Sequence, residues 1–329
     1  MTWPELPRPR GVLSASVLDA LAAPPGGTLR APSVAGADPY GDDLQLALHV
    51  CYELHYRSFA GVDPGWEWDP ALLQFRGTME RAFLDALRAG TSGGRDAAAT
   101  IDALLVEPVD GGGLARRLRD RGDLDQMREY VAQRSIYHLK EADPQAWVIP
   151  RLSGPAKAAL VAVEYDEYGA GRGDRMHQRL FADLMAGLGL DARYLAYLDD
   201  VPGPMLAVVN LMSLLGLHQG LRGALVGHFA AAEITTPPSA RRLAEALQRM
   251  GAPDECAEFY TEHIEADAVH EQVMRHDVVG GLLDTEPALA PDVVFGVEAT
   301  GLVEDRFAAH LAGAWDEGRT SLRTPLPAP

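Results

Sequence analysis

The sequence predicts an all-α protein. Apolar residues recur at helical spacing along most of the chain, and Pro- and Gly-rich stretches interrupt that spacing between segments. No stretch alternates polar and apolar residues for long enough to predict a strand, and no internal repeat is found. We therefore expect one domain of packed helices over residues 42–317, preceded by an irregular N-terminal arm (1–41) and followed by a tail (318–329).

The first half of the domain begins where the Pro-, Gly- and Ala-rich arm ends. From Asp42 the apolar residues take up helical spacing, and Asp69-Pro70 supplies a helix cap followed by proline at the first helical position. Asp143-Pro144 ends the last helix of this half. The helices expected here cover about 42–55, 70–87, 96–105, 113–120 and 123–141.

The second half contains the longest predicted helix. The segment Gly169-Ala-Gly-Arg-Gly173 separates two helices, and Thr235-Thr-Pro-Pro238 is expected to stop another, because proline disrupts helix interiors. The helices expected here cover about 154–168, 174–188, 203–216, 219–234, 238–250, 253–276 and 293–316.

Composition excludes several classes of function. The formal net charge of −18 argues against a nucleic-acid partner, because phosphate binding requires a basic surface. Two cysteines form no disulfide framework, and the N-terminus lacks the apolar core of a signal peptide. No apolar run reaches the length of a membrane span. We expect a cytoplasmic protein, and apolar helix surfaces favour a homodimer.

Three potential metal ligands share one helix face. His263, Asp267 and His270 stand at positions i, i+4 and i+7, which lie within about 60° of arc on a helix. They span about 10 Å along the axis, which suits two ions with Asp267 between them. The alternative interpretation is a solvated polar face, but the neighbouring Phe259 and Ile264 are apolar.

Further carboxylates lie at the ends of apolar stripes. Glu233 follows such a stripe, and burial of an unpaired carboxylate is costly, so it is expected to have a cation or metal partner. Glu167 also points inward, with Glu164 as a rival one turn earlier. The glycine-rich segment after Glu167 would bring His177 back to it, although the same segment also fits an ordinary loop.

A third carboxylate, Glu141, is expected at the end of the helix that holds His138, which competes with it as a ligand. An acidic residue there opposes the helix dipole, which suggests a partner. Tyr56 and His55 are weaker candidates for a pocket.

The complete set resembles the heme-oxygenase-like di-iron oxidases and oxygenases, and most closely their N-oxygenase members. The segments RSIYHLKEADPQAW, VEYDEYGAG and HIEADAVHEQVMRHD carry this resemblance, which covers roughly 42–316. The resemblance implies a seven-helix bundle with extra N-terminal helices. The iron ligands that it implies are Glu167, His177, Glu233, His263, Asp267 and His270. It implies that a further carboxylate, Glu141, is recruited to the oxidised cluster.

The resemblance implies an O2-dependent enzyme with two iron ions. Two ferrous ions would reduce O2 to a bridging peroxide, which oxidises an amine or guanidine nitrogen of a small biosynthetic substrate, with Glu141 and Glu167 as the catalytic carboxylates. An external electron donor, either a reductase or a small reductant, is expected. A desaturating, decarboxylating or C–C-cleaving oxidase on the same cofactor is the alternative, and a non-catalytic helical metal protein is the third possibility. The absence of Glu-x-x-His argues against a ferritin-like site.

Overall fold

The computed structural model describes residues 3–27, 29–106 and 113–327, with the side chains of residues 265–268 outside that description. Within these ranges every regular element is a helix and none is a strand, which confirms the all-α prediction. The α-helices are α1 (Val12–Leu21), α2 (Asp42–Glu53), α3 (Pro70–Ala89), α4 (Ala97–Leu104), α5 (Leu114–Arg121), α6 (Leu124–His138), α7 (Asp143–Ala146), α8 (Gly154–Glu167), α9 (His177–Gly187), α10 (Gly203–Leu217), α11 (Arg222–Met250), α12 (Glu258–Gln272), α13 (Gly281–Thr285) and α14 (Ala290–Asp316).

Short turns of other helix types connect these helices. One of them, η6 (Val273–Gly280), is π-helical and continues α12 into α13. The others are 3-10 turns, namely η1 (Pro64–Trp68), η2 (Ile149–Arg151), η3 (Gly169–Gly171), η4 (Gln219–Leu221), η5 (Asp254–Ala257) and η7 (Pro287–Leu289).

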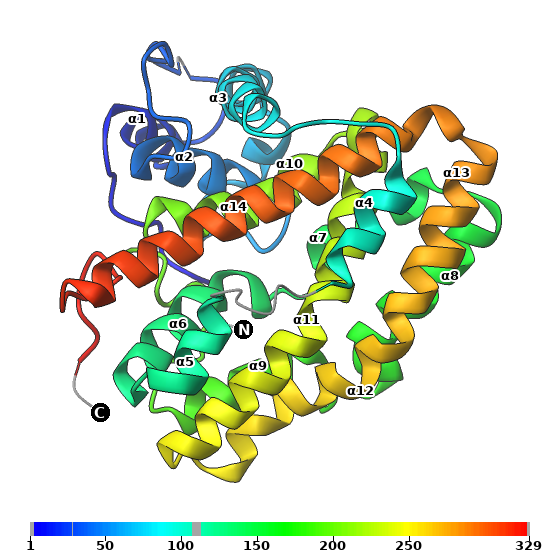
Figure 1. Cartoon of the computed structure of the whole chain (residues 1–329). Helices are drawn as coiled ribbons and strands as arrows, with labels where there is room; N and C mark the ends of the chain where they lie inside the picture. The colour runs from blue at the N-terminus through cyan, green and yellow to red at the C-terminus, as the bar shows by residue number, and fades with distance from the viewer. Residues whose placement is uncertain (1–2, 28, 107–112, 328–329) are drawn as a thin grey trace.

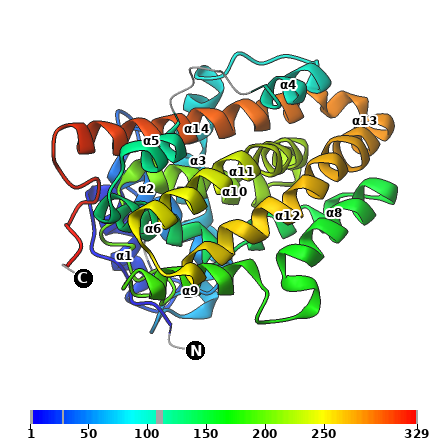
Figure 2. The same ribbon diagram turned by 60° about the horizontal axis from the view of Figure 1, so that its bottom comes forward.

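The long helix α11 is the centre of the molecule. It packs against α12 on one side and against α14 on another, and α10 leads into it. In Figure 1, α14 crosses the bundle. Helices α1, α2 and α3 lie in the upper left of this view, and α8, α12 and α13 lie on its right side. The turned view shows α11, α12 and α8 in succession (Figure 2). The faces of α8, α11 and α12 thus come together inside the bundle.

Two glycines allow α11 and α14 to cross closely. A Cβ atom added to Gly227 would lie 2.9 Å from the carbonyl carbon of Val293, and one added to Gly296 would lie 2.7 Å from that of Ala224. Each glycine therefore faces the backbone of the opposite helix, an approach that only a residue without a side chain permits.

The predicted helix boundaries need three corrections in the second half. The expected stop at Thr235–Pro238 is wrong, because α11 continues through Pro237 and Pro238 to Met250. Each interior proline costs roughly 3 kcal/mol of local helix stability, but packing against α12, α14 and α5 outweighs this cost. The helix expected from residue 174 begins only at His177, and the expected 253–276 helix consists of η5, α12 and part of η6.

The N-terminal arm is not irregular throughout. Residues Val12–Leu21 form α1, whose Leu13, Val17 and Leu21 are buried and pack against α2. The carboxylate of Asp43 on α2 accepts hydrogen bonds from the backbone N–H groups of Leu13 (3.0 Å) and Ser14 (2.8 Å). This cap belongs to α2, so the arm by itself gives a weak helical signal.

Helix α10 is buried along nearly its whole length, including Asn210. No described helix is by itself long and apolar enough to cross a membrane. The pair formed by α10 and the segment Gln219–Met250 reaches that length only across a bend of 109°.

Candidate metal centre

Six of the seven side chains expected to bind metal converge in two buried clusters. Within each cluster, one potential ligand atom from every residue lies within 4.8 Å of the others. The seventh residue, Asp267, has a side chain that lies outside the described part of the structure. The first cluster contains Glu141, His177 and His263, and the second contains Glu167, Glu233 and His270.

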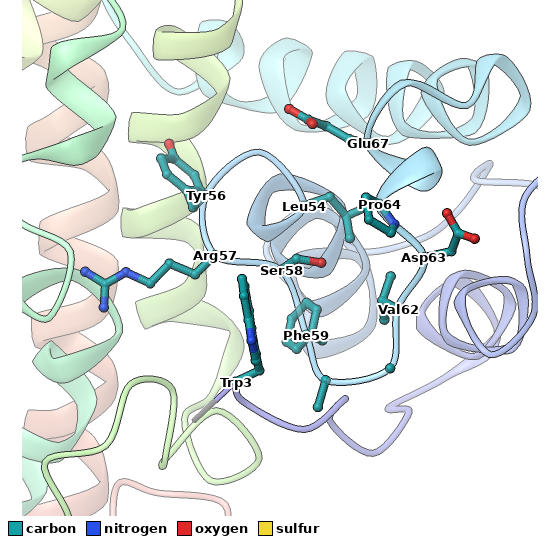
Figure 3. A pocket seen from close by; sticks show the side chains of 12 residues that line it. Trp3, Leu54, Tyr56, Arg57, Ser58, Phe59, Val62, Asp63, Pro64 and Glu67 are labelled. Carbon is teal, nitrogen blue, oxygen red and sulfur yellow. The ribbon is translucent and has the colours of Figure 1, made fainter. Parts of the chain in front are cut away.

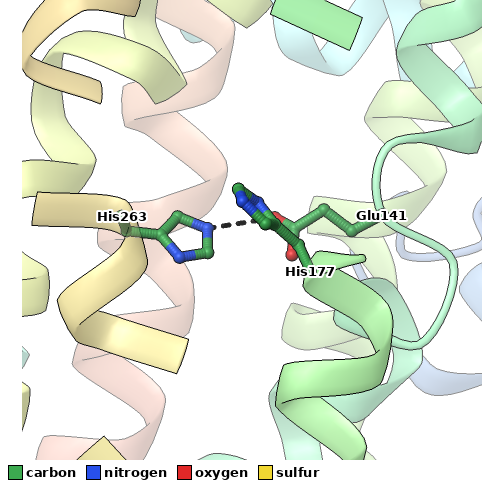
Figure 4. Close-up of side chains that lie close together, drawn as sticks. All are labelled: Glu141, His177 and His263. Atoms are coloured by element: carbon green, nitrogen blue, oxygen red, sulfur yellow. Dashed lines mark ion pairs between the residues drawn. The ribbon is translucent and has the colours of Figure 1, made fainter. Parts of the chain in front are cut away.

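The first cluster joins three segments that are distant in sequence. His177 is the first residue of α9 and His263 lies on α12, and their ring centres are 4.3 Å apart. Glu141 does not end a helix as expected, because α6 ends at His138 and Glu141 lies in the connection to α7. Its Oε1 is 3.9 Å from His263 Nε2, as the dashed line in Figure 4 indicates.

Hydrogen bonds orient the side chains of the first cluster. His263 Nδ1 donates to the carbonyl oxygen of Phe259 at 2.7 Å, so the proton lies on Nδ1 and the unprotonated Nε2, which faces Glu141, is the candidate ligand atom. His138 Nδ1 lies 2.9 Å from Glu141 Oε2 and holds the second oxygen of that carboxylate. The rival His138 therefore contacts a candidate ligand and belongs to neither cluster.

The second cluster is built by α8, α11 and α12. His270 Nδ1 lies 3.1 Å from Glu233 Oε2 and 3.7 Å from Glu167 Oε1. On the other side of the ring, His270 Nε2 donates to Asp166 Oδ2 at 3.2 Å. A carboxylate on the outer nitrogen of a metal-binding histidine is a recurrent feature, because it fixes the ring and raises the basicity of the inner nitrogen.

Glu167 lies between the clusters. Its Oε2 is 2.8 Å from His177 Nδ1 in the first cluster, and its Oε1 faces His270 in the second. The chain reverses between Glu167 and His177 through Gly169, Ala170 and Gly171, which all have positive φ angles of 73°, 51° and 82°. A Cβ atom on Gly169 would lie 2.7 Å from the backbone of Arg175 and Met176, so this reversal requires glycine there.

The charges of the six residues are unbalanced in the absence of a cation. Burial raises the pKa of Glu167, and the neighbouring Glu233 and Glu141 raise it further. Burial also opposes ionisation of Glu141, but the adjacent His138 outweighs it and holds the pKa of that carboxyl far below its usual range. Burial disfavours the charged form of His270, yet contacts with Glu233 raise its pKa to about 9. Three carboxylates so close together favour a divalent cation.

The donor chemistry fits iron or manganese. Imidazole nitrogens and carboxylate oxygens suit these metals. Burial, and then the nearby His263, lower the pKa of His177 to about 4, so this imidazole is neutral and able to coordinate. Its buried Nδ1 has no hydrogen-bond partner among the described residues, although Glu167 Oε2 is close. Two ligand atoms that approach each other without a hydrogen bond are arranged as they would be around a shared ion. The free cysteines Cys51 and Cys256 belong to neither cluster.

Asp166 is a functional candidate that the sequence did not indicate. Because it directly precedes Glu167, its side chain is rotated about 100° around α8 from that of Glu167, and the sequence pattern places it on the solvent-exposed face. Its contact with His270 depends on how α12 packs, which no spacing within α8 reveals. The other rival, Glu164, is buried but belongs to neither cluster.

A separate pocket of about 300 Å³ lies beside residues 54–67 (Figure 3). Tyr56 contributes to its wall, as do Trp3 and Arg57, whereas His55 instead pairs with Glu67. Among the residues that the structure describes, neither metal cluster contributes to the lining of this pocket.

Two comparisons with known proteins concern this region. The model of a family described as iron-containing redox enzyme matches residues 128–305, a range that includes both clusters. The nitrosourea synthase of Streptomyces achromogenes subsp. streptozoticus is 26% identical over 218 residues, which cover 66% of this chain and 43% of that protein. The chain therefore spans less than half the length of this curated relative.

Proposed function

The chain belongs to the iron-containing redox enzymes, and from this membership we propose that it is a non-heme di-iron oxygenase that uses O2 to oxidise an amine or guanidine-type nitrogen of a small biosynthetic substrate. The observation that carries the proposal is the position of Glu167, whose two oxygens each face one buried cluster of histidine and carboxylate donors. A carboxylate placed in this way suits a pair of ions a few ångströms apart.

We assign the ligands as follows. The first cluster would hold one iron and the second cluster the other, and Glu167 would contribute to both sites. The proposed assignment of Asp267 rests on its position between His263 and His270 on α12. Two ferrous ions bound there would supply electrons for the reduction of O2. The proposed ligands are Glu141, Glu167, His177, Glu233, His263, Asp267 and His270.

The protein's own groups determine which protons move. The raised pKa of His270 favours its protonated form in the metal-free protein, so metal binding at Nδ1 would displace a proton. His270 Nε2 would keep its proton, which it donates to Asp166, and His263 Nδ1 would keep the proton that it donates to the Phe259 carbonyl. Burial of both clusters keeps bulk water from the reacting atoms.

The overall reaction must balance. Transfer of one oxygen atom to nitrogen leaves the second oxygen atom as water, and this consumes two electrons and two protons in each turnover. The proposal therefore includes an external electron donor, which is either a reductase or a small reductant. Oxidation at nitrogen is preferred because the relative is named for the synthesis of a nitrosourea, a compound with an oxidised nitrogen.

Metal analysis and product analysis test the proposal. We expect the iron-loaded protein to contain two irons per chain, and we expect Glu167→Ala and His263→Ala to abolish O2 consumption. Mass spectrometry of candidate amines and guanidines after incubation with 18O2 is expected to show a gain of labelled oxygen. Loss of hydrogen or of carbon from the product would instead indicate a desaturase or a C–C-cleaving oxidase. A Glu167→Ala variant with full iron content and activity would refute the ligand assignment.

A further inference from the structure

Glu164 is a buried carboxylate without a partner. Its side chain is 2% exposed, and neither Oε1 nor Oε2 has a hydrogen-bond partner among the described residues. It lies on α8 one turn before Glu167, so the two carboxylates share a face of the helix. A buried carboxylate without hydrogen bonds is strongly destabilising, and native proteins rarely retain one without a reason.

The surroundings of Glu164 are acidic. Burial, followed by the charges of Glu167, Glu233 and Asp143, raises the pKa of Glu164 to about 9. Asp143 itself accepts a hydrogen bond from the Tyr168 hydroxyl at 2.9 Å, so this tyrosine is already engaged. A positive charge next to Glu164 would therefore offset the negative charges around it.

A second buried acceptor without a donor lies nearby. Gln145 is fully buried, and its Nε2 donates to the Tyr137 hydroxyl at 3.1 Å, while its Oε1 has no partner among the residues described. Glu164 is close enough to Tyr137 for its charge to raise the pKa of that hydroxyl, after burial and the other carboxylates. The region around Tyr137 thus has more buried acceptors than donors.

We propose that Glu164 binds the cationic head group of the substrate, a guanidinium or an ammonium, and holds it beside the metal centre. This inference rests on the proposed function and adds a binding residue to it. A guanidinium offers paired N–H donors that match both oxygens of a carboxylate, and an ammonium offers three donors at one point. Either cation would satisfy Glu164 and place its nitrogen one helical turn from Glu167.

The contrasting assignment makes Glu164 a metal ligand. The close-packed clusters contain Glu167 and not Glu164, which favours the substrate role. The two assignments differ in what a Glu164→Gln substitution removes. A ligand would take iron with it, whereas a substrate-binding residue would leave the iron content unchanged.

The test measures binding without turnover. Anaerobic, iron(II)-loaded protein is titrated by calorimetry with methylguanidinium, methylammonium and the neutral methylurea. We expect at least one of the cations to bind wild-type protein and methylurea to bind at least tenfold more weakly. Glu164→Gln should weaken binding of that cation by about tenfold to a hundredfold, the range for a lost charge-assisted hydrogen bond. Glu164→Asp, which keeps the charge, should recover part of the affinity, and Glu255→Gln, at an exposed position, is the matched control.

Three results would overturn the inference. These are equal cation affinity in wild type and Glu164→Gln, binding of methylurea as tight as that of the cations, and loss of iron from Glu164→Gln. Each of them leaves the proposed function standing if the wild-type protein still binds two irons and consumes O2. Failure of the wild-type protein to bind iron would instead refute the proposed function.

Discussion

The close crossing of α11 and α14 gives the sharpest test of the fold. In Gly296→Ala, the new methyl group would lie 2.7 Å from the carbonyl carbon of Ala224, which is backbone and cannot rotate away. Ordinary contacts of this kind begin near 3.4 Å, so the helices must separate by roughly 0.7 Å or more. Gly301, five residues later on α14, has nothing within 4 Å of an added Cβ and supplies the matched control.

The expected magnitudes follow from these distances. Overpacking of a close-packed site costs about 1–3 kcal/mol, and the upper end applies here because neither backbone can yield locally. Replacing a mid-helix glycine with alanine stabilises the helix by up to about 1 kcal/mol, because alanine has the higher helix propensity. We therefore expect Gly296→Ala to lose about 2 kcal/mol in net unfolding free energy and Gly301→Ala to gain about 1 kcal/mol. At about 2 °C per kcal/mol, the melting temperatures should differ by roughly 6 °C.

The assay compares thermal and denaturant unfolding of the two variants in metal-free form, since bound metal would add its own stabilisation. Iron binding is then measured separately. Gly227, which faces Val293 at the same crossing, lies six residues before Glu233, so a displaced α11 should also weaken the second metal cluster. Equal stability of Gly296→Ala and Gly301→Ala would show that the helices do not cross at this distance.

Three further predictions concern polar contacts of buried side chains. Asp166→Asn should weaken iron binding about tenfold, measured by equilibrium dialysis, because the amide can still accept from His270 but no longer carries the negative charge that raises the basicity of the ring. Burial lowers the pKa of His228 to about 4, so below pH 6.5 the unfolded chain binds a proton at this residue while the folded protein does not. Between pH 6.5 and 4, the unfolding free energy of His228→Gln should therefore fall by about 3 kcal/mol less than that of the wild-type protein. The same dependence of stability on pH in both proteins would contradict the burial argument. Lys140→Met should destabilise the protein by about 3–5 kcal/mol because it removes the cation that balances the charge of the buried Glu53, and adding Glu53→Gln should restore most of this loss.

The sequence predicted the direction of the candidate ligand side chains well where spacing along one helix determines that direction. His263 and His270 point to the same side because α12 is a regular helix over that stretch. The positions of Glu167 and His177 followed from the glycines between them, since only a reversal could bring the two together. The prediction was less accurate for Glu141, because a residue just beyond a helix end is placed by the loop and by neighbours such as His138.

Helix boundaries failed where packing overrides local preference. The interior prolines of α11 predict a break, but the helix is enclosed by partners that gain more from its continuity than the prolines cost. The π-helical turn η6 has no distinct periodic signal over so short a segment, so it reads as ordinary helix. In α1, the stabilising cap comes from Asp43 on another helix, which a local pattern cannot include.

Charge balance connects the metal proposal with the substrate proposal. The proposed ligands Glu141, Glu167, Glu233 and Asp267 carry four negative charges when ionised, and two ferrous ions would cancel them if the histidines are neutral. The raised pKa of Glu164, about 9, keeps its carboxyl protonated at neutral pH when no cation is beside it, and an ionised Glu164 would be one buried negative charge in excess. A monocationic guanidinium or ammonium would cancel it, whereas a neutral amine would leave the carboxyl protonated. The substrate should therefore bind in its cationic form and must lose a proton before its nitrogen can be oxidised, and Glu164, as the proposed partner of that cation, would accept the proton.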